Sequence, residues 1–134
     1  MNVPTLDISG AEASARIRIT RKQQLQLSYT AAHSGNLPAN YLSEYAFNYA
    51  AQNAIFAYTG SFGQLTARTQ VNIVQKTTQA AYPLWDIDFA RNTGRVRPYL
   101  RLLNLSNTAY TEIPLVPMQG RTIMGGMELN WSKR

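Results

Sequence analysis

Two aspartates separated by a single residue are the side chains best placed to do chemistry. Asp86 and Asp88 fall on the same face of an extended strand, where paired carboxylates could bind a cation or act as general acid and base. The alternation of apolar and polar residues places Arg68, Arg97 and Arg101 on that face too. Because a guanidinium pairs readily with a carboxylate, the sequence favours ion pairs, or contact with another domain, over catalysis.

No other residue type offers a catalytic or metal site. His33 is the only histidine and comes before Ser34-Gly35-Asn36, at the end of a predicted strand. A loop position explains it better than a role as base or ligand. The absence of cysteine excludes disulfides and thiolate metal centres. We therefore predict that the protein is not an enzyme and has no catalytic residue, no metal site and no cofactor.

The composition is unusual for a cytosolic domain. Of 134 residues, 45% are apolar but only 15% are charged, and Gln, Asn, Thr and Ser fill the balance. The net charge of +6 raises the possibility of nucleic-acid binding, yet no basic cluster exceeds two adjacent residues. No run approaches the roughly 18 apolar residues of a membrane-spanning helix. The start, MNVPTLDISG, lacks the pattern of a secretion signal.

Alternation with a period of two residues, the period of a β-strand, dominates the chain. From Gln23 to Ala31 the odd positions are apolar and the even positions are polar. The pattern predicts an all-β protein of seven long strands, at 11–20, 23–31, 52–60, 64–73, 84–89, 96–102 and 122–131, the third being the weakest. The strands are expected to form an antiparallel up-and-down meander.

Short and long connections are predicted to alternate. Short turns are expected at Arg21-Lys22, Ser61-Phe62-Gly63 and Asn92-Thr93-Gly94, and longer connections at 34–48, 78–82 and 107–120. Outer-membrane β-barrels have this asymmetry, with tight periplasmic turns and long external loops. The predicted strands are also near the length that a tilted strand needs to cross a bilayer.

Charged residues follow the polar positions of the predicted strands. In a membrane barrel a Lys or Arg on the lipid face near the midplane costs about 2–4 kcal/mol, whereas one facing the lumen is tolerated. A soluble β-sandwich would show the same alternation, with its apolar positions in a core, and the pattern leaves both alternatives open. For a barrel, we predict that eight residues face the lumen or a domain within it: Arg16, Arg18, Arg68, Asp86, Asp88, Arg97, Arg101 and Glu128.

The last third of the chain carries a family resemblance. The run 96–110, VRPYLRLLNLSNTAY, with its Asn-Leu-x-Asn-x-x-Tyr ending, resembles the penultimate strand of TonB-dependent outer-membrane receptors. The segments 112–114 (EIP) and 117–122 (PMQGRT) are similar to the family's last extracellular loop and the entry to its final strand, which ends in an aromatic residue, here Trp131. The strand pair that begins at Gly10-Ala11-Glu12 also resembles these barrels, so the likeness covers nearly the whole chain.

This resemblance implies that residues 1–134 are the C-terminal segment of a large transmembrane β-barrel of about 22 strands with a plug inside it. The expected partners are outer-membrane lipid, the remainder of the barrel with its plug, and the TonB system through a missing N-terminal part, but no nucleic acid. The expected function in a Gram-negative outer membrane is active uptake of a scarce ligand such as a siderophore or cobalamin, for which a seven-strand fragment alone is not competent.

The sequence also offers candidate ligand contacts and an alternative function. The aromatic loop between the second and third strands offers ligand-contact candidates, which are Tyr41, Glu44, Tyr45 and Phe47. The alternative function is that of a soluble β-rich binding module, which could bind nucleic acid through the basic strand faces that carry Arg16, Arg18, Arg97 and Arg101.

Overall fold

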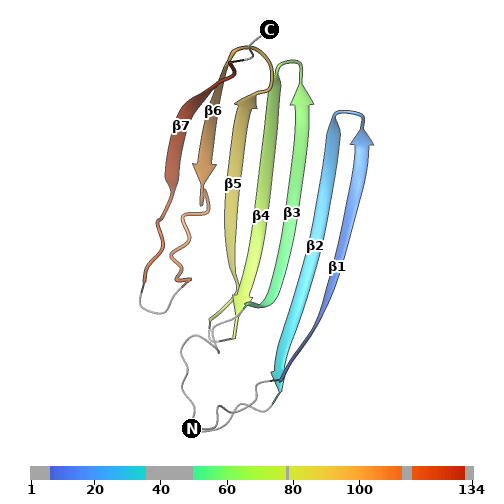
Figure 1. Cartoon of the computed structure of the whole chain (residues 1–134). Coiled ribbons are helices and arrows are strands. Elements are labelled where there is room, and N and C mark those ends of the chain that lie inside the picture. The colour runs from blue at the N-terminus through green and yellow to red at the C-terminus, as the bar shows by residue number, and fades with distance from the viewer. Residues whose placement is uncertain (1–6, 36–49, 78, 113–115, 132–134) are drawn as a thin grey trace.

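Seven β-strands make up most of the backbone that the structure describes. The computed structural model describes residues 7–35, 50–77, 79–112 and 116–131. The strands are β1 (Asp7–Thr20), β2 (Gln23–Gly35), β3 (Ala50–Phe62), β4 (Leu65–Lys76), β5 (Tyr82–Arg91), β6 (Val96–Leu103) and β7 (Thr122–Leu129). They form one antiparallel sheet in the order β1-β2-β3-β4-β5-β6-β7, so the predicted all-β meander is confirmed (Figure 1).

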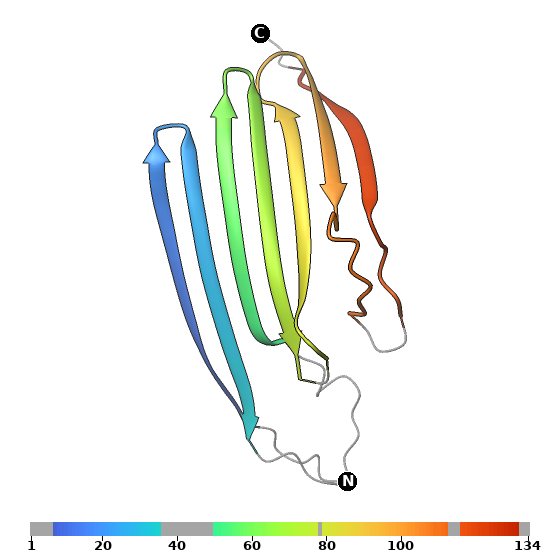
Figure 2. The same cartoon turned by 180° about the vertical axis from the view of Figure 1, so that it is seen from behind.

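The sheet has a turn end and a loop end. The β1–β2, β3–β4 and β5–β6 connections lie together at the turn end, and the connections that follow β2, β4 and β6 leave from the opposite, loop end (Figures 1 and 2). The predicted alternation of short and long connections is therefore confirmed. One predicted turn was misplaced: Ser61 and Phe62 belong to β3, and the chain reverses at Gly63 and Gln64, where Gly63 has a φ of 62°.

Several strands are longer or shorter than the alternation predicted. β1 extends back to Asp7 and contains 14 residues, whereas β7 contains 8. β2 runs through His33 to Gly35, because Ser9 and His33 are still paired in register. Backbone pairing between β1 and β2 thus continues past the point at which the side chains stop alternating. His33 lies within a strand and not in a loop as predicted.

The register brings the apolar stripe of every strand to one side of the sheet. For example, Ile17 pairs with Leu25, Leu25 with Tyr58, and Tyr58 with Thr69. Since paired residues of antiparallel strands point to the same side, the six pairings join seven separate stripes into one surface. This surface, the apolar face, carries Ala13, Ala15, Ile17, Leu25, Leu27, Tyr29, Ala54, Phe56, Tyr58, Thr69, Val71, Ile73, Trp85, Ile87, Phe89, Pro98, Leu100, Leu102, Ile123, Gly125 and Met127.

The opposite side, the polar face, carries the charged positions. Its members include Arg16, Arg18, Gln24, Gln26, Asn53, Ala57, Thr59, Arg68, Gln70, Asn72, Asp86, Asp88, Arg97, Tyr99, Arg101, Met124, Gly126 and Glu128. Among the described strand residues, the charged side chains on the apolar parity are Asp7 and Arg91, each at a strand end. The middle of the apolar face is thus free of charge over its described extent.

The apolar face is more exposed than the polar face, which is the reverse of the usual arrangement in a water-soluble sheet. Phe56 is 48% exposed on the apolar face, whereas its neighbour Ala57 on the polar face is 6% exposed. In β6, Val96, Pro98 and Leu100 are exposed, while Arg97 and Tyr99 between them are partly shielded. The polar face is therefore the more enclosed side. No large side chain of the described residues is fully buried, and no second layer covers either face (Figures 1 and 2).

Over the same residues, no helix is long and apolar enough to cross a membrane.

Candidate functional site

A row of charged side chains crosses the polar face in one register. Arg68 on β4 lies opposite Asp88 on β5, and Asp88 lies opposite Arg101 on β6. The Arg101 Nε lies 3.3 Å from Asp88 Oδ1, and the Arg101 guanidinium carbon is 5.4 Å from the centroid of the Tyr99 ring. Arg68 donates to Gln70 Oε1 at 2.6 Å. Asp88 therefore serves an ion pair, as the sequence predicted for this face.

A second ion pair lies nearer the turn end. Arg97 and Glu128 are opposite each other in β6 and β7, with Nη2 3.2 Å from Oε2. The Arg97 side chain is 33% exposed and that of Glu128 is 67% exposed, so solvent screens the pair. The Arg97 Nε is buried and has no hydrogen-bond partner among the described residues.

Asp86 has a different role from Asp88. Its Oδ1 accepts a hydrogen bond of 2.8 Å from the backbone N–H of Asn104, the first residue after β6. The two aspartates therefore do not act as a pair. Asp88 pairs with Arg101, whereas Asp86 binds the backbone at the start of the β6–β7 loop. Among the described residues, no group of three or more His, Cys, Asp and Glu side chains could hold a metal ion.

Asn104 organises the connection between β6 and β7. It is 5% exposed and adopts a left-handed φ of 49°. Its Nδ2 donates to the carbonyls of Thr108 and Gln119, at 2.9 and 3.2 Å, and its Oδ1 accepts from the Thr108 N–H and the Ser106 hydroxyl, each at 3.0 Å. β6 ends at Leu103, and the Asn104 side chain is paired entirely with the loop that follows.

Asn107 and Arg121 extend this network. Asn107 also has a left-handed φ, of 52°, and its Oδ1 accepts from the backbone N–H of Arg121 at 3.2 Å. The Arg121 side chain donates to the Leu105 carbonyl at 3.0 Å. The loop is tied to β5 by the Thr108 hydroxyl, which donates to the Pro83 carbonyl at 2.7 Å, and the Ser106 hydroxyl, 2.9 Å from the same carbonyl, has its one proton for either Pro83 or Asn104. The two sequence segments that carry the family resemblance thus form one hydrogen-bonded unit.

Lys76 secures the same loop from the end of β4. It is 8% exposed, and its Nζ donates to the carbonyls of Thr111 and Glu112, at 2.6 and 3.2 Å. Next to it, Tyr110 stacks on Tyr82 with ring centroids 5.5 Å apart. Burial, and then the negative charges of Glu112 and Asp86, raises the pKa of Tyr110. Sequence reasoning missed this role of Lys76, because its partners Thr111 and Glu112 lie 35 and 36 residues further along the chain.

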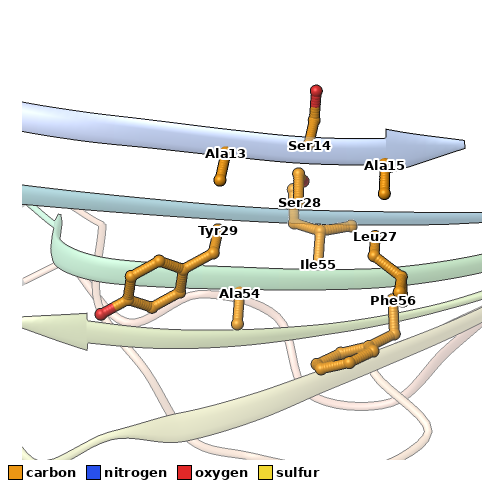
Figure 3. A pocket seen from close by; sticks show the side chains of 9 residues that line it. All are labelled: Ala13, Ser14, Ala15, Leu27, Ser28, Tyr29, Ala54, Ile55 and Phe56. Atoms are coloured by element: carbon orange, nitrogen blue, oxygen red, sulfur yellow. The ribbon is translucent and has the colours of Figure 1, made fainter.

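A shallow apolar hollow lies where β1, β2 and β3 run side by side. Ala13, Ala15 and Ala54 form its floor, and the larger side chains of Tyr29 and Phe56 project beside them (Figure 3). The register row Ala13-Tyr29-Ala54 has a large side chain between two small ones, and the row Ala15-Leu27-Phe56 has two large side chains next to a small one. The hollow measures about 340 Å³ and belongs to the exposed apolar face.

The structure places the eight predicted lumen-facing residues on one side of the sheet. Arg68, Asp88 and Arg101 come together, as do Arg97 and Glu128, while Asp86 binds Asn104. Arg16 and Arg18 lie opposite the neutral residues Gln26 and Gln24. The predicted ligand-contact residues Tyr41, Glu44, Tyr45 and Phe47 lie outside the described residues.

Comparisons of the chain with family models, with curated proteins and with solved structures find no match.

Proposed function

We propose that this sheet is a section of the wall of an outer-membrane β-barrel of the TonB-dependent receptor type. In this proposal the apolar face meets lipid, the polar face lines a hydrated interior, and the loop end faces outward. The barrel would take up a scarce ligand such as a siderophore or cobalamin, and this section would supply a lipid-sealed wall and part of the lumen lining. The cellular location proposed is the outer membrane of a Gram-negative bacterium.

One observation carries the proposal: six independent strand pairings collect the apolar stripes on the side that is the more exposed. A water-soluble sheet needs a second layer over such a surface, because large exposed apolar patches are costly in water. The described residues supply no second layer. Hydrocarbon is a medium in which Phe56, Trp85 and Met127 can remain exposed without that cost.

The polar face supports the same orientation. Asn53 and Asn72 each have a buried Oδ1 without a hydrogen-bond partner among the described residues. Together with Arg16, Arg18 and Arg68, these groups would be costly against hydrocarbon. Water or another polar domain must therefore cover this face. A hydrated lumen provides such cover, whereas an apolar core does not.

The sheet edges set a requirement on the assembly. β1 and β7 each have one side without a neighbouring strand in the described sheet. In a bilayer every unpaired backbone N–H or C=O costs several kcal/mol, so only a closed ring of strands is stable there. The proposal thus requires further strands beside β1 and β7, and the sheet alone does not make a pore.

The resemblance to TonB-dependent receptors also gains physical support. The Asn-Leu-x-Asn-x-x-Tyr run and the Gln-Gly-Arg entry to the last strand meet through Asn104 and Asn107, which hold the carbonyl of Gln119 and the backbone N–H of Arg121. These residues therefore have a common task, which is to fold the loop between the last two strands.

Matched arginine substitutions test the proposal. Leu27→Arg and Val71→Arg place a charge on the apolar face, while Gln26→Arg and Gln70→Arg place the same charge one residue away on the polar face. In lipid the first pair should each cost about 2–4 kcal/mol near the midplane, and the second pair should be tolerated. The measurement is the yield of each variant in alkali-resistant outer membranes, expressed from the protein's own gene in a Gram-negative host.

The expected result is loss of Leu27→Arg and Val71→Arg from the membrane fraction, with Gln26→Arg and Gln70→Arg retained. Recovery of the unsubstituted protein as a folded monomer without detergent would overturn the proposal. So would equal yields of all four variants.

A further inference from the structure

Positive charge is concentrated at the turn end of the sheet. Of the described lysines and arginines, Lys76 ends β4 and Arg121 precedes β7 at the loop end, whereas Arg18, Arg21, Lys22, Arg68, Arg91, Arg95 and Arg97 lie in or near the turns. One register row of the polar face, Arg18, Gln24, Thr59, Arg68, Asp88, Arg101 and Met124, contains three arginines and one aspartate. The single carboxylate of this row binds Arg101 at 3.3 Å.

Two sets of basic residues near the turn end differ in their surroundings. Arg97 and Arg101 have acidic residues directly opposite, at ion-pair distance. Arg18 on β1 lies opposite Gln24, four strands away from Asp88 on β5, and the β1–β2 turn adds Arg21 and Lys22. Within the described part of the chain, no acidic side chain pairs with this second set. Its charges are therefore available to an anion.

The second set surrounds a hollow of about 620 Å³ between the β1–β2 turn and the end of β3. Besides Arg18, Arg21 and Lys22, its walls include Thr20, Gln24 and Thr59, which are neutral hydrogen-bonding side chains. No acidic residue lines it. A cation-lined hollow without an internal counter-charge attracts anions and increases their local concentration.

The backbone of the turn is fixed. The N–H of Ser61 on β3 donates to the Lys22 carbonyl at 2.9 Å, and the N–H of Lys22 donates to Thr20 Oγ1 at 3.2 Å. The turn is thereby tied to the neighbouring hairpin. A fixed backbone reduces the ordering cost when the side chains close on a ligand.

The donor set suits a phosphate group better than a carboxylate. The residues that line the hollow carry two guanidinium groups, one ammonium group, three hydroxyls and two amides. A carboxylate offers two oxygens and one negative charge, whereas a phosphate monoester offers three terminal oxygens and a charge of about −1.5 to −2 at neutral pH. Arginine forks match phosphate geometry, and lysine adds a point charge.

We propose that the hollow lined by Arg18, Arg21 and Lys22 is a binding site for the phosphate group of a small phosphorylated ligand. The site depends on the β1–β2 turn and on β3, and it needs neither a membrane nor a closed barrel. It goes beyond the uptake function proposed above and can be right or wrong independently of it.

The test is calorimetric titration of the full chain in detergent micelles, at constant ionic strength, with inorganic phosphate, glycerol 3-phosphate and a triglutamate peptide. The variant is Arg18→Gln/Arg21→Gln/Lys22→Gln. Arg95→Gln is the matched control, because Arg95 lies in the β5–β6 turn at the same end of the sheet but outside the hollow. Circular dichroism of each variant verifies that the strands are retained.

Both phosphates are expected to bind saturably, with a loss of at least about tenfold in affinity in the triple variant and a change below about twofold in Arg95→Gln. Tighter binding of glycerol 3-phosphate than of inorganic phosphate identifies an esterified ligand, and equal binding identifies the free ion. Unchanged phosphate affinity in the folded triple variant overturns the proposal. Binding of triglutamate without phosphate also overturns it, since the surface would then fit an acidic polypeptide.

The same titration separates this site from the membrane role. Saturable phosphate binding by a detergent-free folded monomer would retain the site while removing the barrel proposal. Membrane assembly of a chain that does not bind phosphate would retain the barrel proposal and remove the phosphate site.

Discussion

The indole Nε1 of Trp85 donates a hydrogen bond to Thr69 Oγ1, 2.8 Å away on the neighbouring strand β4. The Thr69 hydroxyl donates in turn to the Asp86 carbonyl at 3.3 Å. Both side chains belong to the apolar face, on which Trp85 is 42% exposed. The indole N–H is therefore satisfied by the sheet itself, although it lies on an open surface. In water the indole N–H could bond to a water molecule instead, whereas hydrocarbon offers it no other partner.

This relationship predicts that Thr69→Val is costly only where water is absent. Valine preserves the shape of threonine but leaves the indole N–H without an acceptor. Against hydrocarbon, the free energy of unfolding should fall by about 1–3 kcal/mol, the cost of an unsatisfied buried donor. In water the change should stay below about 0.5 kcal/mol, since water replaces the hydroxyl. Urea titration of the chain in lipid micelles measures the difference.

The control for this prediction is the same substitution in a Trp85→Phe background. Phenylalanine has no N–H to lose its partner, so Thr69→Val should then cost only the longer bond to the Asp86 carbonyl, and a double-mutant cycle isolates the bond to the indole. A micelle-embedded Thr69→Val chain as stable as the parent would count against lipid contact at Trp85.

The faces of the sheet could be predicted from the sequence because the period of a strand is fixed. The alternation within each segment puts Leu27, Phe56 and Val71 on the apolar stripe of its own strand, and the register places the three in one row. The strand ends could not be predicted in the same way. Ile8 pairs with Ser34 through backbone groups, which alternation of side chains does not report.

Which side chains of the site pair with one another could be predicted only with the strand register known. The sequence predicted mutual pairing among the charged residues of the polar face, but any of several arginines could have met Asp88. The register places both Arg68 and Arg101 opposite Asp88, and it is Arg101 that makes the ion pair, while Arg68 bonds to Gln70. The burial of Asn104 by loop carbonyls depends on Gln119, which is 15 residues further along the chain, and no local pattern connects the two.

Asn104 is predicted to control the stability of the β6–β7 loop. Asn104→Ala removes its side-chain hydrogen bonds and places a Cβ-bearing residue without a local polar partner at a left-handed φ. We expect a loss of at least about 2 kcal/mol in the free energy of unfolding. Asn104→Gly, which tolerates this φ, should recover part of the loss. Hydrogen exchange at the Thr108 amide measures the local effect, and unchanged protection in Asn104→Ala would refute the role.

The Arg97–Glu128 ion pair is predicted to contribute little. Because both side chains are partly exposed, a double-mutant cycle with Arg97→Gln and Glu128→Gln should give a coupling of about 0.2–1 kcal/mol. The coupling should vanish near 1 M salt, where the screening length is about 3 Å. Chemical unfolding at low and high salt measures it. A coupling that is large and insensitive to salt would mean that another domain excludes solvent from this part of the polar face.

Gly126 and Gly125 are predicted to respond differently to alanine. A Cβ at Gly126 would lie 2.5 Å from the Tyr99 hydroxyl oxygen, whereas one at Gly125 would meet only the Tyr99 carbonyl oxygen at 3.9 Å. Gly125→Ala should therefore gain about 0.5–1 kcal/mol from reduced backbone entropy in the unfolded chain. Gly126→Ala should lose that gain, because the displaced Tyr99 ring gives up its contact with Arg101, worth about 0.5–1 kcal/mol.

Removing the Tyr99 ring should restore the gain. In a Tyr99→Ala background, Gly126→Ala has no ring to displace and should stabilise the sheet as much as Gly125→Ala does. Thermal unfolding of the four variants measures this coupling. If Gly126→Ala stabilises the protein equally with and without the ring, then the ring does not lie against Gly126. In that case another contact, and not the Tyr99 ring, shields Gly126 on the polar face.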